Sequence, residues 1–293
     1  MACNICPRNC KIDRTAAVGF CGCSSVVRVA RAALHFDEEP SISGTRGSGT
    51  IFFSGCNLKC IFCQNMVLTS GTLGEVFDVP RLADVMLKLQ ALSAHNINLV
   101  TPTPHRDAIV AALRLAKSKG LSIPIVYNTN AYESVDTIRA YEGLVDIYLP
   151  DLKYVDPRLS LKFSRAADYF DTAIESVAEM IRQVGFMETD ENGIAKKGVR
   201  IRHLVLPGCV FDTRSVLDAI KKRFGVDCPI SLMSQFTPIP ECTVKPLDRP
   251  LTPREYESAL DYCVSLGFTN VFTQELTSVG RSFTPPFSDH VDL

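Results

Sequence analysis

The chain has 293 residues, 46% of them hydrophobic and 22% charged, and its 31 basic and 32 acidic residues leave a net charge of −1. This balance gives no reason to expect binding to a nucleic acid or an anionic membrane, and no apolar run approaches the ~20 residues that a membrane span requires. The first residues lack the apolar core of a signal peptide, so we expect a cytoplasmic protein. The length suits one α/β barrel with a short appendage.

The twelve cysteines are unevenly distributed, and eight of them lie in the first 63 residues, in two tight groups. In a reducing compartment, tightly spaced cysteines are more often metal ligands than disulfide partners. The other four are scattered, and we interpret them as small buried packing residues. They are Cys209, Cys228, Cys242 and Cys263.

Residues 1–48 are predicted to form a cysteine-rich module with little helix or strand pattern, which ends in a Gly- and Ser-rich stretch at 43–50. The spacing Cys-x2-Cys-x3-Cys-x10-Cys supplies enough thiolates for a tetrahedral zinc site or a second iron–sulfur cluster. A segment with so few large apolar residues folds poorly without metal. Zinc would make the module a structural or docking element, and a cluster would make it an electron relay. The predicted ligands are Cys3, Cys6, Cys10 and Cys21, with Cys23 as a surplus cysteine.

From residue 49 to residue 293, short apolar runs alternate with stretches of helical period, which predicts an α/β fold with helices outside a mostly parallel sheet. The sheet could close as a partial or full βα barrel, with an open doubly wound sheet as the competing topology. Residues 82–92 are expected to form one face of a helix, and a capping box with proline at 252–255 is expected to begin another. An exposed turn or hairpin is expected at 188–198, and residues 280–293 are expected to run along the surface. The expected strands are 50–54, 97–101, 123–128, 145–150, 198–207, 229–234 and 270–274.

The second cysteine group follows the first predicted barrel strand, where barrel enzymes place their chemistry. Cys56, Cys60 and Cys63 have the spacing Cys-x3-Cys-x2-Cys, and Gln64 and Asn65 follow where a fourth cysteine could have stood. Closely spaced thiolates suit an iron–sulfur cluster or zinc. A cubane held by three cysteines leaves one iron without a protein ligand, so a substrate or cofactor can bind that iron directly. The competing interpretation is a structural zinc site or a chance cysteine loop.

This loop, with Phe62 just before its last cysteine, resembles the cluster motif of the radical S-adenosylmethionine (SAM) superfamily. The resemblance implies a radical SAM βα barrel with a [4Fe-4S] cluster, whose open iron is chelated by the amino and carboxylate groups of S-adenosylmethionine. One electron from the cluster then cleaves a C–S bond and yields a 5′-deoxyadenosyl radical, which abstracts hydrogen from the substrate. A barrel suits this chemistry because it shields the radical from water.

The wider string 54–65 resembles the branch that contains pyruvate formate-lyase activating enzyme, and the similarity extends over nearly the whole chain. Similar segments are found at 98–105, 127–133, 146–154, 202–208 and 233–238. This branch implies a glycyl-radical protein as substrate and an electron donor such as flavodoxin or ferredoxin. Two alternatives stay open: radical chemistry on a small molecule or peptide, and a non-catalytic iron–sulfur or zinc scaffold.

Each matched segment ends a predicted strand, so its polar residues should meet at one barrel mouth. Activating enzymes usually carry Gly-Gly-Glu after the second strand, where this chain has Thr-Pro-Thr-Pro at 101–104, so hydroxyls or backbone carbonyls must make that contact. Asp151 and Lys153 could instead form an ordinary ion pair, Asn128 could serve a turn, and His105 could cap a helix. Arg200 and His203 are alternatives to Arg202. The predicted cofactor contacts are Thr101, Asn128, Thr129, Asp151, Lys153, Arg202 and Gln235.

Overall fold

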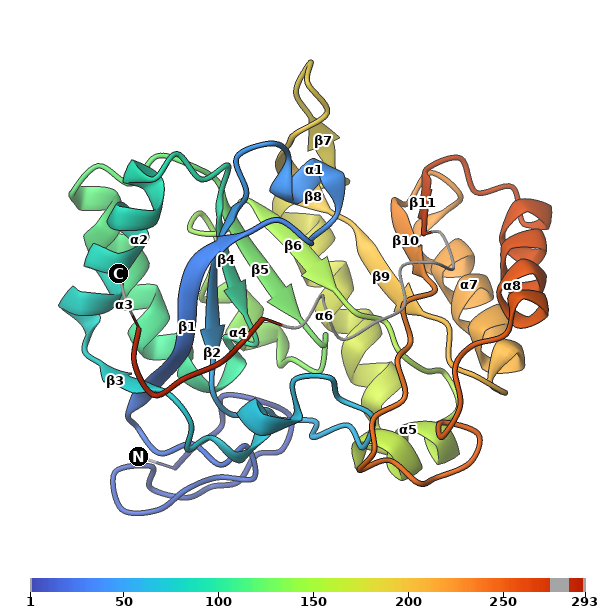
Figure 1. Ribbon diagram of the computed structural model, residues 1–293, viewed down its shortest axis with the longest axis horizontal. Helices are drawn as coiled ribbons and strands as arrows, with labels where there is room; N and C mark the ends of the chain where they lie inside the picture. The colour runs from blue at the N-terminus through green and yellow to red at the C-terminus, as the bar shows by residue number, and fades with distance from the viewer. Residues whose placement is uncertain (1, 275–284, 292–293) are drawn as a thin grey trace.

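The computed structural model describes residues 2–274 and 285–291. Its centre is a sheet whose parallel strands follow one another in chain order, as the strand–helix alternation predicts (Figure 1). All seven predicted strand regions are confirmed, and the fifth is split into two strands. The strands are β1 (Val27–His35), β2 (Ser48–Phe53), β3 (Glu75–Phe77), β4 (Ile97–Val100), β5 (Ile125–Thr129), β6 (Ile147–Pro150), β7 (Glu188–Thr189), β8 (Ala195–Val199), β9 (Ile201–Leu204), β10 (Ile230–Met233) and β11 (Val271–Thr273).

The sheet forms an incomplete barrel. One ladder has the order β3-β1-β2-β4-β5-β6-β8-β7 and a second has the order β11-β10-β9. The two are continuous because only Arg200 separates β8 from β9, and a parallel bridge links Asp151 to Arg202. Among the described residues, no ladder joins β11 back to β1 or β3. Of the two closures that the sequence allows, the structure therefore shows the partial barrel.

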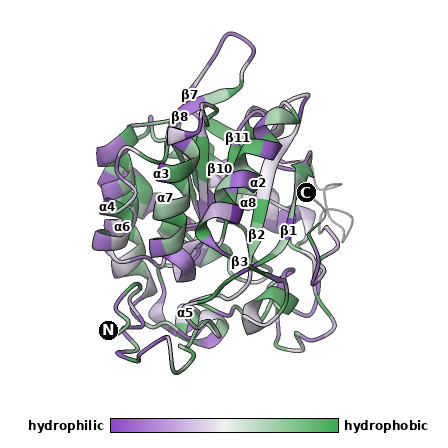
Figure 2. Cartoon of the chain, turned by 90° about the vertical axis from the view of Figure 1, so that its left-hand side faces the viewer, coloured by the Kyte–Doolittle hydropathy of each residue, from purple (hydrophilic) through white to green (hydrophobic). Residues whose placement is uncertain are grey.

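Helices cover the outside of the sheet, and Figure 2 shows hydrophilic segments on outer helices such as α4 and α6. The predicted face of the first long helix is buried, except that Leu92 caps its end and is exposed. The capping box at Thr252 and Glu255 is confirmed. The helices are α1 (Pro40–Ser43), α2 (Val79–Ala91), α3 (Arg106–Ser118), α4 (Val135–Arg139), α5 (Pro157–Ser164), α6 (Tyr169–Val184), α7 (Val210–Phe224) and α8 (Pro253–Ser265), with short 3-10 turns η1 (Met66–Ser70) and η2 (Thr103–His105).

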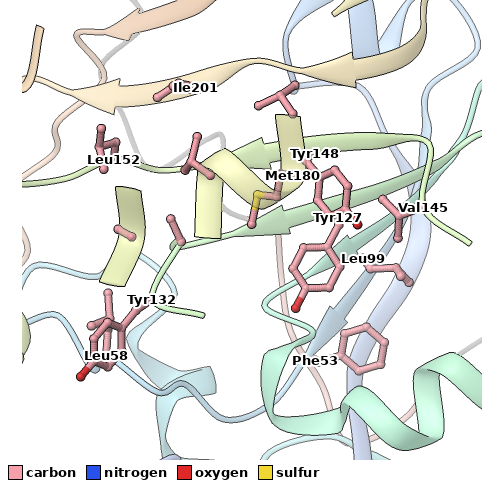
Figure 3. Packing of buried hydrophobic residues seen from close by; sticks show 14 of the residues in the cluster. Phe53, Leu58, Leu99, Tyr127, Tyr132, Val145, Tyr148, Leu152, Met180 and Ile201 are labelled. Carbon is pink, nitrogen blue, oxygen red and sulfur yellow. The ribbon is translucent and has the colours of Figure 1, made fainter. Parts of the chain in front are cut away.

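Aromatic side chains join the helices to the sheet and so fix the strand ends. The Tyr127 ring lies 4.8 Å from the ring of Tyr141 and 5.7 Å from that of Tyr148, measured between centroids. Figure 3 shows Tyr127 and Tyr148 packed among Leu99, Val145 and other buried side chains. The four scattered cysteines, Cys209, Cys228, Cys242 and Cys263, are all buried, which confirms their role in packing.

The predicted module 1–48 contains a strand that the sequence analysis did not predict. Strand β1 pairs antiparallel with β2, so that Ala32 faces Ile51. The cysteine-bearing part is therefore the loop of residues 2–26, hereafter the N-terminal loop, which lies at the carboxyl ends of the parallel strands (Figure 1). No helix in the described part of the chain is both long and apolar enough to cross a membrane.

The hairpin and the C-terminal segment lie at the periphery of the barrel. The predicted hairpin at 188–198 is confirmed, since β7 pairs antiparallel with β8. Of the predicted surface strip, residues 280–284 and 292–293 lie outside the described residues. The described part, 285–291, runs along β1, where Ser288 donates its N–H to Ala30 and Phe287 packs edge-on against Phe52.

Candidate active site

The three-cysteine loop follows β2 at the carboxyl end of the parallel strands, as predicted. Gly55 begins it with φ of +94°, a backbone conformation that favours glycine. A Cβ at this position would lie 2.0 Å from the Cys23 sulfur, so a side chain has no room here. The Gly55 N–H also donates to Leu68 O at 2.6 Å. Glycine thus lets the loop pass directly over the N-terminal loop.

All ten residues predicted for the cluster and the cofactor line a single cavity of about 250 Å³, hereafter the barrel cavity. The carboxyl ends of parallel strands meet at one edge, so residues distant in sequence converge there. A neighbouring cavity of about 220 Å³ shares several of these residues and adds Phe62, whose ring packs against Phe236. The ten residues are Cys56, Cys60, Cys63, Thr101, Asn128, Thr129, Asp151, Lys153, Arg202 and Gln235.

The cysteine thiols of the loop have an environment that suits metal ligands. Burial raises the pKa of Cys63 to about 12 and also raises the pKa of Cys60, so without a metal both would be neutral at pH 7. Ser164 Oγ donates to Cys60 Sγ at 3.0 Å, and Asn130 Nδ2 lies 3.7 Å from Cys56 Sγ. Hydrogen bonds of this kind adjust the potential of an iron–sulfur cluster.

The three cysteines of the loop are compatible with a cluster. They line one cavity, and no fourth cysteine lines it among the described residues. A structural zinc site is usually closed by four protein ligands, whereas in a cubane each thiolate binds its own iron and one iron can accept another ligand. Three thiolates therefore fit a [4Fe-4S] cluster with one open iron.

Asp151 and Lys153 form an ion pair inside the barrel cavity, with 2.7 Å between Oδ2 and Nζ. Burial lowers the pKa of Lys153, but the neighbouring Asp151 carboxylate outweighs this effect, so the net pKa lies above its ordinary value. The ammonium group is therefore charged beside the cysteine loop. The pair is mostly buried, unlike the exposed ion pair that was the alternative interpretation.

Replacing Asp151 with alanine is expected to weaken S-adenosylmethionine binding about tenfold or more while leaving the iron content unchanged. A lost hydrogen bond to a charged group costs roughly 1.5–3 kcal/mol, and about 1.4 kcal/mol corresponds to a factor of ten in Kd. Equilibrium binding to the reconstituted protein measures the effect. The control is Asp84→Ala, which removes an exposed ion pair with Lys119. Equal affinity of wild type and Asp151→Ala would remove Asp151 from the site.

Arg202 lines the barrel cavity, but its guanidinium is already paired with two acidic residues that the sequence analysis missed. Its Nε donates to Glu39 Oε1 at 2.8 Å, and its Nη2 contacts both Glu38 and Glu39. Asn128 joins this network through Glu38 and Arg202. Arg202, Glu38, Glu39 and Asn128 thus form a hydrogen-bonded network at the base of the cavity, hereafter the barrel floor. The only signal in the sequence is the acidic run 37–39.

The two alternatives to Arg202 lie elsewhere. Arg200 donates to Ser41 Oγ at 3.1 Å. His203 is buried, with its ring nitrogens 2.7 Å from Leu152 O and 3.0 Å from Thr213 Oγ1. Neither lines the barrel cavity. Gln235 does line it, and its carbonyl accepts a hydrogen bond from Gln64 at 3.3 Å.

The Thr-Pro-Thr-Pro segment divides between the cavity and the core. Thr101 lines the cavity with φ of +56°, a rare conformation for threonine. Thr103 instead donates to Glu133 at 2.5 Å. His105 is buried, with its Nε2 2.9 Å from Ser54 O, so it supports the base of the cysteine loop rather than capping α3 with its side chain.

Glu133 is a buried carboxyl that the sequence analysis did not single out. Thr129 Oγ1 donates to its Oε1 at 2.6 Å, so the Thr129 hydroxyl is occupied although the residue lines the cavity. Its Oε2 has no hydrogen-bond partner among the described residues. Burial raises the pKa of Glu133 from 4.5 to about 7. The folded protein therefore holds a proton here that the unfolded chain releases between these pH values.

Glu133→Gln is expected to flatten the pH dependence of stability between pH 5 and pH 8. In the wild type, the raised pKa of Glu133 means that its protonated form stabilises the folded state. This contribution is fully present below pH 4.5, the pKa in the unfolded chain, and is lost as the pH rises through about 7. The shift corresponds to roughly 3 kcal/mol. Urea unfolding at several pH values measures it, and Glu175→Gln, at an exposed residue, is the control. An unchanged slope in Glu133→Gln would contradict this assignment.

The four predicted N-terminal ligands also meet. Cys3, Cys6, Cys10 and Cys21 line one small enclosed space of about 10 Å³. Cys23 lies apart from that space, with its sulfur 3.3 Å from Ser54 O and next to Gly55. The Cys23 thiol nevertheless forms a hydrogen bond with that of Cys21, so its exclusion from the set stays a prediction.

Comparison with known proteins identifies the family. The family model described as the Radical SAM superfamily matches residues 50–208, more than half of the chain. The chain belongs to the radical SAM superfamily. This membership implies a [4Fe-4S] cluster and S-adenosylmethionine as cofactors, and it makes the barrel cavity the candidate place for both.

Two curated relatives of this radical SAM protein come from Methanocaldococcus jannaschii. An uncharacterized protein is 30% identical over 271 residues, which cover 88% of this chain and 73% of that protein. A second protein, provisionally named as a glycyl-radical enzyme activating enzyme, is 30% identical over 115 residues, which cover 37% of this chain and 44% of that protein. The second similarity is therefore only partial.

Two solved structures have a similar fold. SuiB of Streptococcus suis, crystallised with S-adenosylmethionine, superposes with a TM-score of 0.51 at 16% identity, covering 75% of this chain and 48% of SuiB. HydG, a maturase of the [FeFe]-hydrogenase, gives a TM-score of 0.52 at 11% identity, covering 75% of this chain and 50% of HydG. The chain thus spans about half the length of these solved proteins, and the likeness shows the fold alone.

Proposed function

We propose that Cys56, Cys60 and Cys63 bind the [4Fe-4S] cluster of this radical SAM enzyme, and that the barrel cavity holds S-adenosylmethionine against its open iron. One observation carries the proposal: the three cysteines and the seven predicted polar contacts line the same cavity. No fourth cysteine lines that cavity among the described residues. One iron is therefore left for a ligand other than a thiolate.

When bound, the cluster and S-adenosylmethionine supply one-electron cleavage of a C–S bond and, through it, hydrogen-atom abstraction. The protein's own residues position the reactants. Lys153 offers a positive charge and Asp151 a negative one at the end of β6, so they can bind the carboxylate and the ribose hydroxyls of the cofactor. Thr101 and Gln235 offer polar groups on either side of this pair.

The proposed substrate is a glycyl-radical protein, activated by removal of one hydrogen atom from a backbone glycine. The partial similarity to the provisionally named activating enzyme supports this substrate. The shape of the site also supports it, because two residues that line the barrel cavity, Asp37 and Gln64, are exposed. The cavity therefore reaches the surface, where a peptide segment of a partner could enter. A flavodoxin or ferredoxin is the proposed electron donor.

The test mixes the reduced, reconstituted enzyme and S-adenosylmethionine with candidate glycyl-radical proteins under anaerobic conditions. We expect an electron paramagnetic resonance doublet from a glycyl radical in one of them, and no doublet when its acceptor glycine is replaced by alanine. Release of 5′-deoxyadenosine without a doublet from any candidate would overturn the glycyl-radical step and favour a small molecule or peptide. The absence of 5′-deoxyadenosine altogether would favour the scaffold interpretation.

A further inference from the structure

The cysteine loop lies close to the protein surface where it contacts the end of α5. Ser164, the last residue of α5, donates its hydroxyl to Cys60 Sγ at 3.0 Å, and Ile61 donates its N–H to Phe163 O at 2.9 Å. Arg165, which follows Ser164, is exposed to solvent. A side chain that touches a proposed cluster ligand is therefore the direct neighbour of an exposed residue.

Arg8 joins the N-terminal loop to the cysteine loop and to α5. Its Nε donates to Asn57 O at 2.8 Å and its Nη2 to Ser164 O at 3.1 Å, while its Nη1 donates to Arg165 O. These partners are backbone carbonyls, which accept the hydrogen bonds but leave the positive charge of the guanidinium in place. Figure 1 shows α5, the segment after β2 and the N-terminal loop along the lower edge of the molecule.

Further basic side chains gather around Arg8. The Nζ of Lys59, within the cysteine loop, lies 5.4 Å from the ring centre of Phe20, and the Arg8 guanidinium lies 4.0 Å from the same ring centre. Lys162 is exposed on the last turn of α5, with its Nζ 5.4 Å from the ring centre of Phe163. Aromatic rings position such cations without removing their charge. The surface that these basic residues form, hereafter the basic face, consists of Arg8, Lys59, Lys162 and Arg165.

The charge of the basic face is not balanced by its surroundings. Within residues 2–274 and 285–291, none of its four cations forms an ion pair, although Arg158 at the start of α5 pairs with Asp156 at 2.7 Å. The exposed Asp168 follows α5, and its Oδ1 accepts a hydrogen bond from the Tyr132 hydroxyl at 2.8 Å. The whole chain has a net charge of −1, so this excess of positive charge is local. Cofactor binding does not account for it, because none of the four described residues lines the barrel cavity.

The composition of the basic face favours a small acidic protein as its partner. Complementary charge speeds the encounter of two proteins and orients them. Leu161, which is 56% exposed and precedes Lys162, adds an apolar contact of the kind that protein interfaces contain. A nucleic acid fits less well, because domains that bind nucleic acids carry an overall excess of basic residues, whereas this chain has 31 basic and 32 acidic ones.

We infer that the basic face is the docking surface of the electron donor, and that this donor is an acidic one-electron carrier protein of the flavodoxin or ferredoxin class. In each encounter the donor loses one electron and the cluster gains one, and no covalent bond forms or breaks. The face suits this step because Ser164, next to Arg165 in the chain, touches the Cys60 sulfur. Small interfaces of electron-transfer proteins are weak, so the oxidised donor can leave. The inference rests on the proposed function, which places the cluster at Cys60.

Binding of an acidic flavodoxin to three full-length, reconstituted proteins tests the docking surface. They are the wild type, a basic-face variant (Lys59→Gln, Lys162→Gln, Arg165→Gln) and a control variant (Arg114→Gln, Lys222→Gln, Arg254→Gln), which removes three exposed cations from α3, α7 and α8. Arg8 is kept because it holds the two loops together. Isothermal titration calorimetry measures Kd, after circular dichroism and iron content confirm that each variant is folded and loaded.

We expect the basic-face variant to bind the flavodoxin about tenfold more weakly than the wild type, since it lacks three exposed charge contacts. The control variant should bind as the wild type does. The difference should vanish at about 1 M salt, where the Debye length is roughly 3 Å. Equal affinities of the three proteins would overturn the docking surface, and so would an equal loss in both variants. Lys162→Gln with Arg165→Gln, which leaves the cysteine loop unchanged, is a milder variant for the same comparison.

Electron transfer is measured with the same three proteins by stopped-flow absorbance. With reduced flavodoxin at low salt, we expect the cluster of the basic-face variant to be reduced at least tenfold more slowly than those of the wild type and the control. With excess dithionite, which needs no docking surface, all three should reach the same final extent of reduction. Equal flavodoxin rates in fully loaded proteins would overturn the docking surface alone. A wild type that binds no iron, or releases no 5′-deoxyadenosine with dithionite, would instead overturn the proposed function.

The other possible occupant of the basic face is the substrate protein. A candidate glycyl-radical protein should bind the wild type and the basic-face variant with equal affinity, because the four basic residues lie outside the barrel cavity that its glycine must enter. The same titration, with that protein in place of the flavodoxin, measures this. A tenfold loss of affinity for the glycyl-radical protein, with unchanged flavodoxin binding, would assign the face to the substrate and overturn the inference.

Discussion

Replacing Cys60 with alanine is expected to reduce the release of 5′-deoxyadenosine from S-adenosylmethionine below detection. Cys60 lines the barrel cavity, and its sulfur accepts a hydrogen bond from Ser164. With only two thiolates left in the barrel cavity, two of the four irons of a cubane would lack a protein ligand. Iron content, visible absorbance and the yield of 5′-deoxyadenosine after reduction measure the effect.

The matched control for this variant is Cys228→Ala. Cys228 is fully buried and burial raises the pKa of its thiol to about 12, but it lies in the packed core and lines no part of the barrel cavity. We expect this variant to keep its iron and its cleavage activity, with only a small loss of stability. Persistent 5′-deoxyadenosine release by Cys60→Ala, or an equal loss in both variants, would contradict the assigned cluster site.

Arg202→Met is expected to destabilise the protein by about 3–5 kcal/mol, the cost of breaking a buried ion pair by removing one partner. The variant leaves Glu38 and Glu39 buried without their shared cation. Although burial raises the pKa of Glu39, Arg202 holds it below its ordinary value. In the variant Glu39 can be protonated, so the loss of stability should shrink as the pH falls. Urea unfolding of the anaerobic apoprotein at pH 5 and pH 8 measures both effects.

Two further variants separate this structural role from cofactor binding. Adding Glu38→Gln and Glu39→Gln to Arg202→Met should recover most of the lost stability, because no buried charge then lacks a partner. Arg223→Met, which removes an exposed ion pair with Glu175, should cost less than about 1 kcal/mol. A fully stable Arg202→Met apoprotein with weakened S-adenosylmethionine binding would show that Arg202 serves the cofactor and not the barrel floor.

The strands and the cysteine loop could be predicted because their signals are local. Buried parallel strands are continuous apolar runs, and the spacing of Cys56, Cys60 and Cys63 is contained in one loop. Strand β1 was missed because it lies among cysteines and loop residues, and because Arg28 and Arg31 interrupt its apolar run. Both arginines donate to backbone carbonyls, Arg28 to Gly74 and Arg31 to Pro286.

The floor of the barrel cavity could not be predicted, because it depends on contacts between residues far apart in sequence. Glu38 and Glu39 meet Arg202 only after β1 folds against β2 and the chain crosses the barrel. Arg202 could be placed at the cavity because it lies in a predicted strand, but no local pattern indicates that its guanidinium is already paired. The same holds for Thr129, whose hydroxyl is occupied by Glu133.

The position of the N-terminal loop was likewise unpredictable. The spacing of Cys3, Cys6, Cys10 and Cys21 indicated a common site, and the structure places these residues around one enclosed space. Nothing in that spacing indicated where the site would lie. Its place beside Cys56 comes from a backbone hydrogen bond and from glycines at close contacts, which carry no periodic signal.

The most direct test concerns the iron that no cysteine binds. Electron–nuclear double resonance is recorded on the reduced, reconstituted protein, with S-adenosylmethionine labelled with ¹⁵N in its amino group. We expect a nitrogen coupling to the cluster that appears only when the labelled cofactor is present. Saturating cofactor with no such coupling, on a cluster whose four irons all have protein ligands, would contradict the assignment of an open iron at Cys56, Cys60 and Cys63.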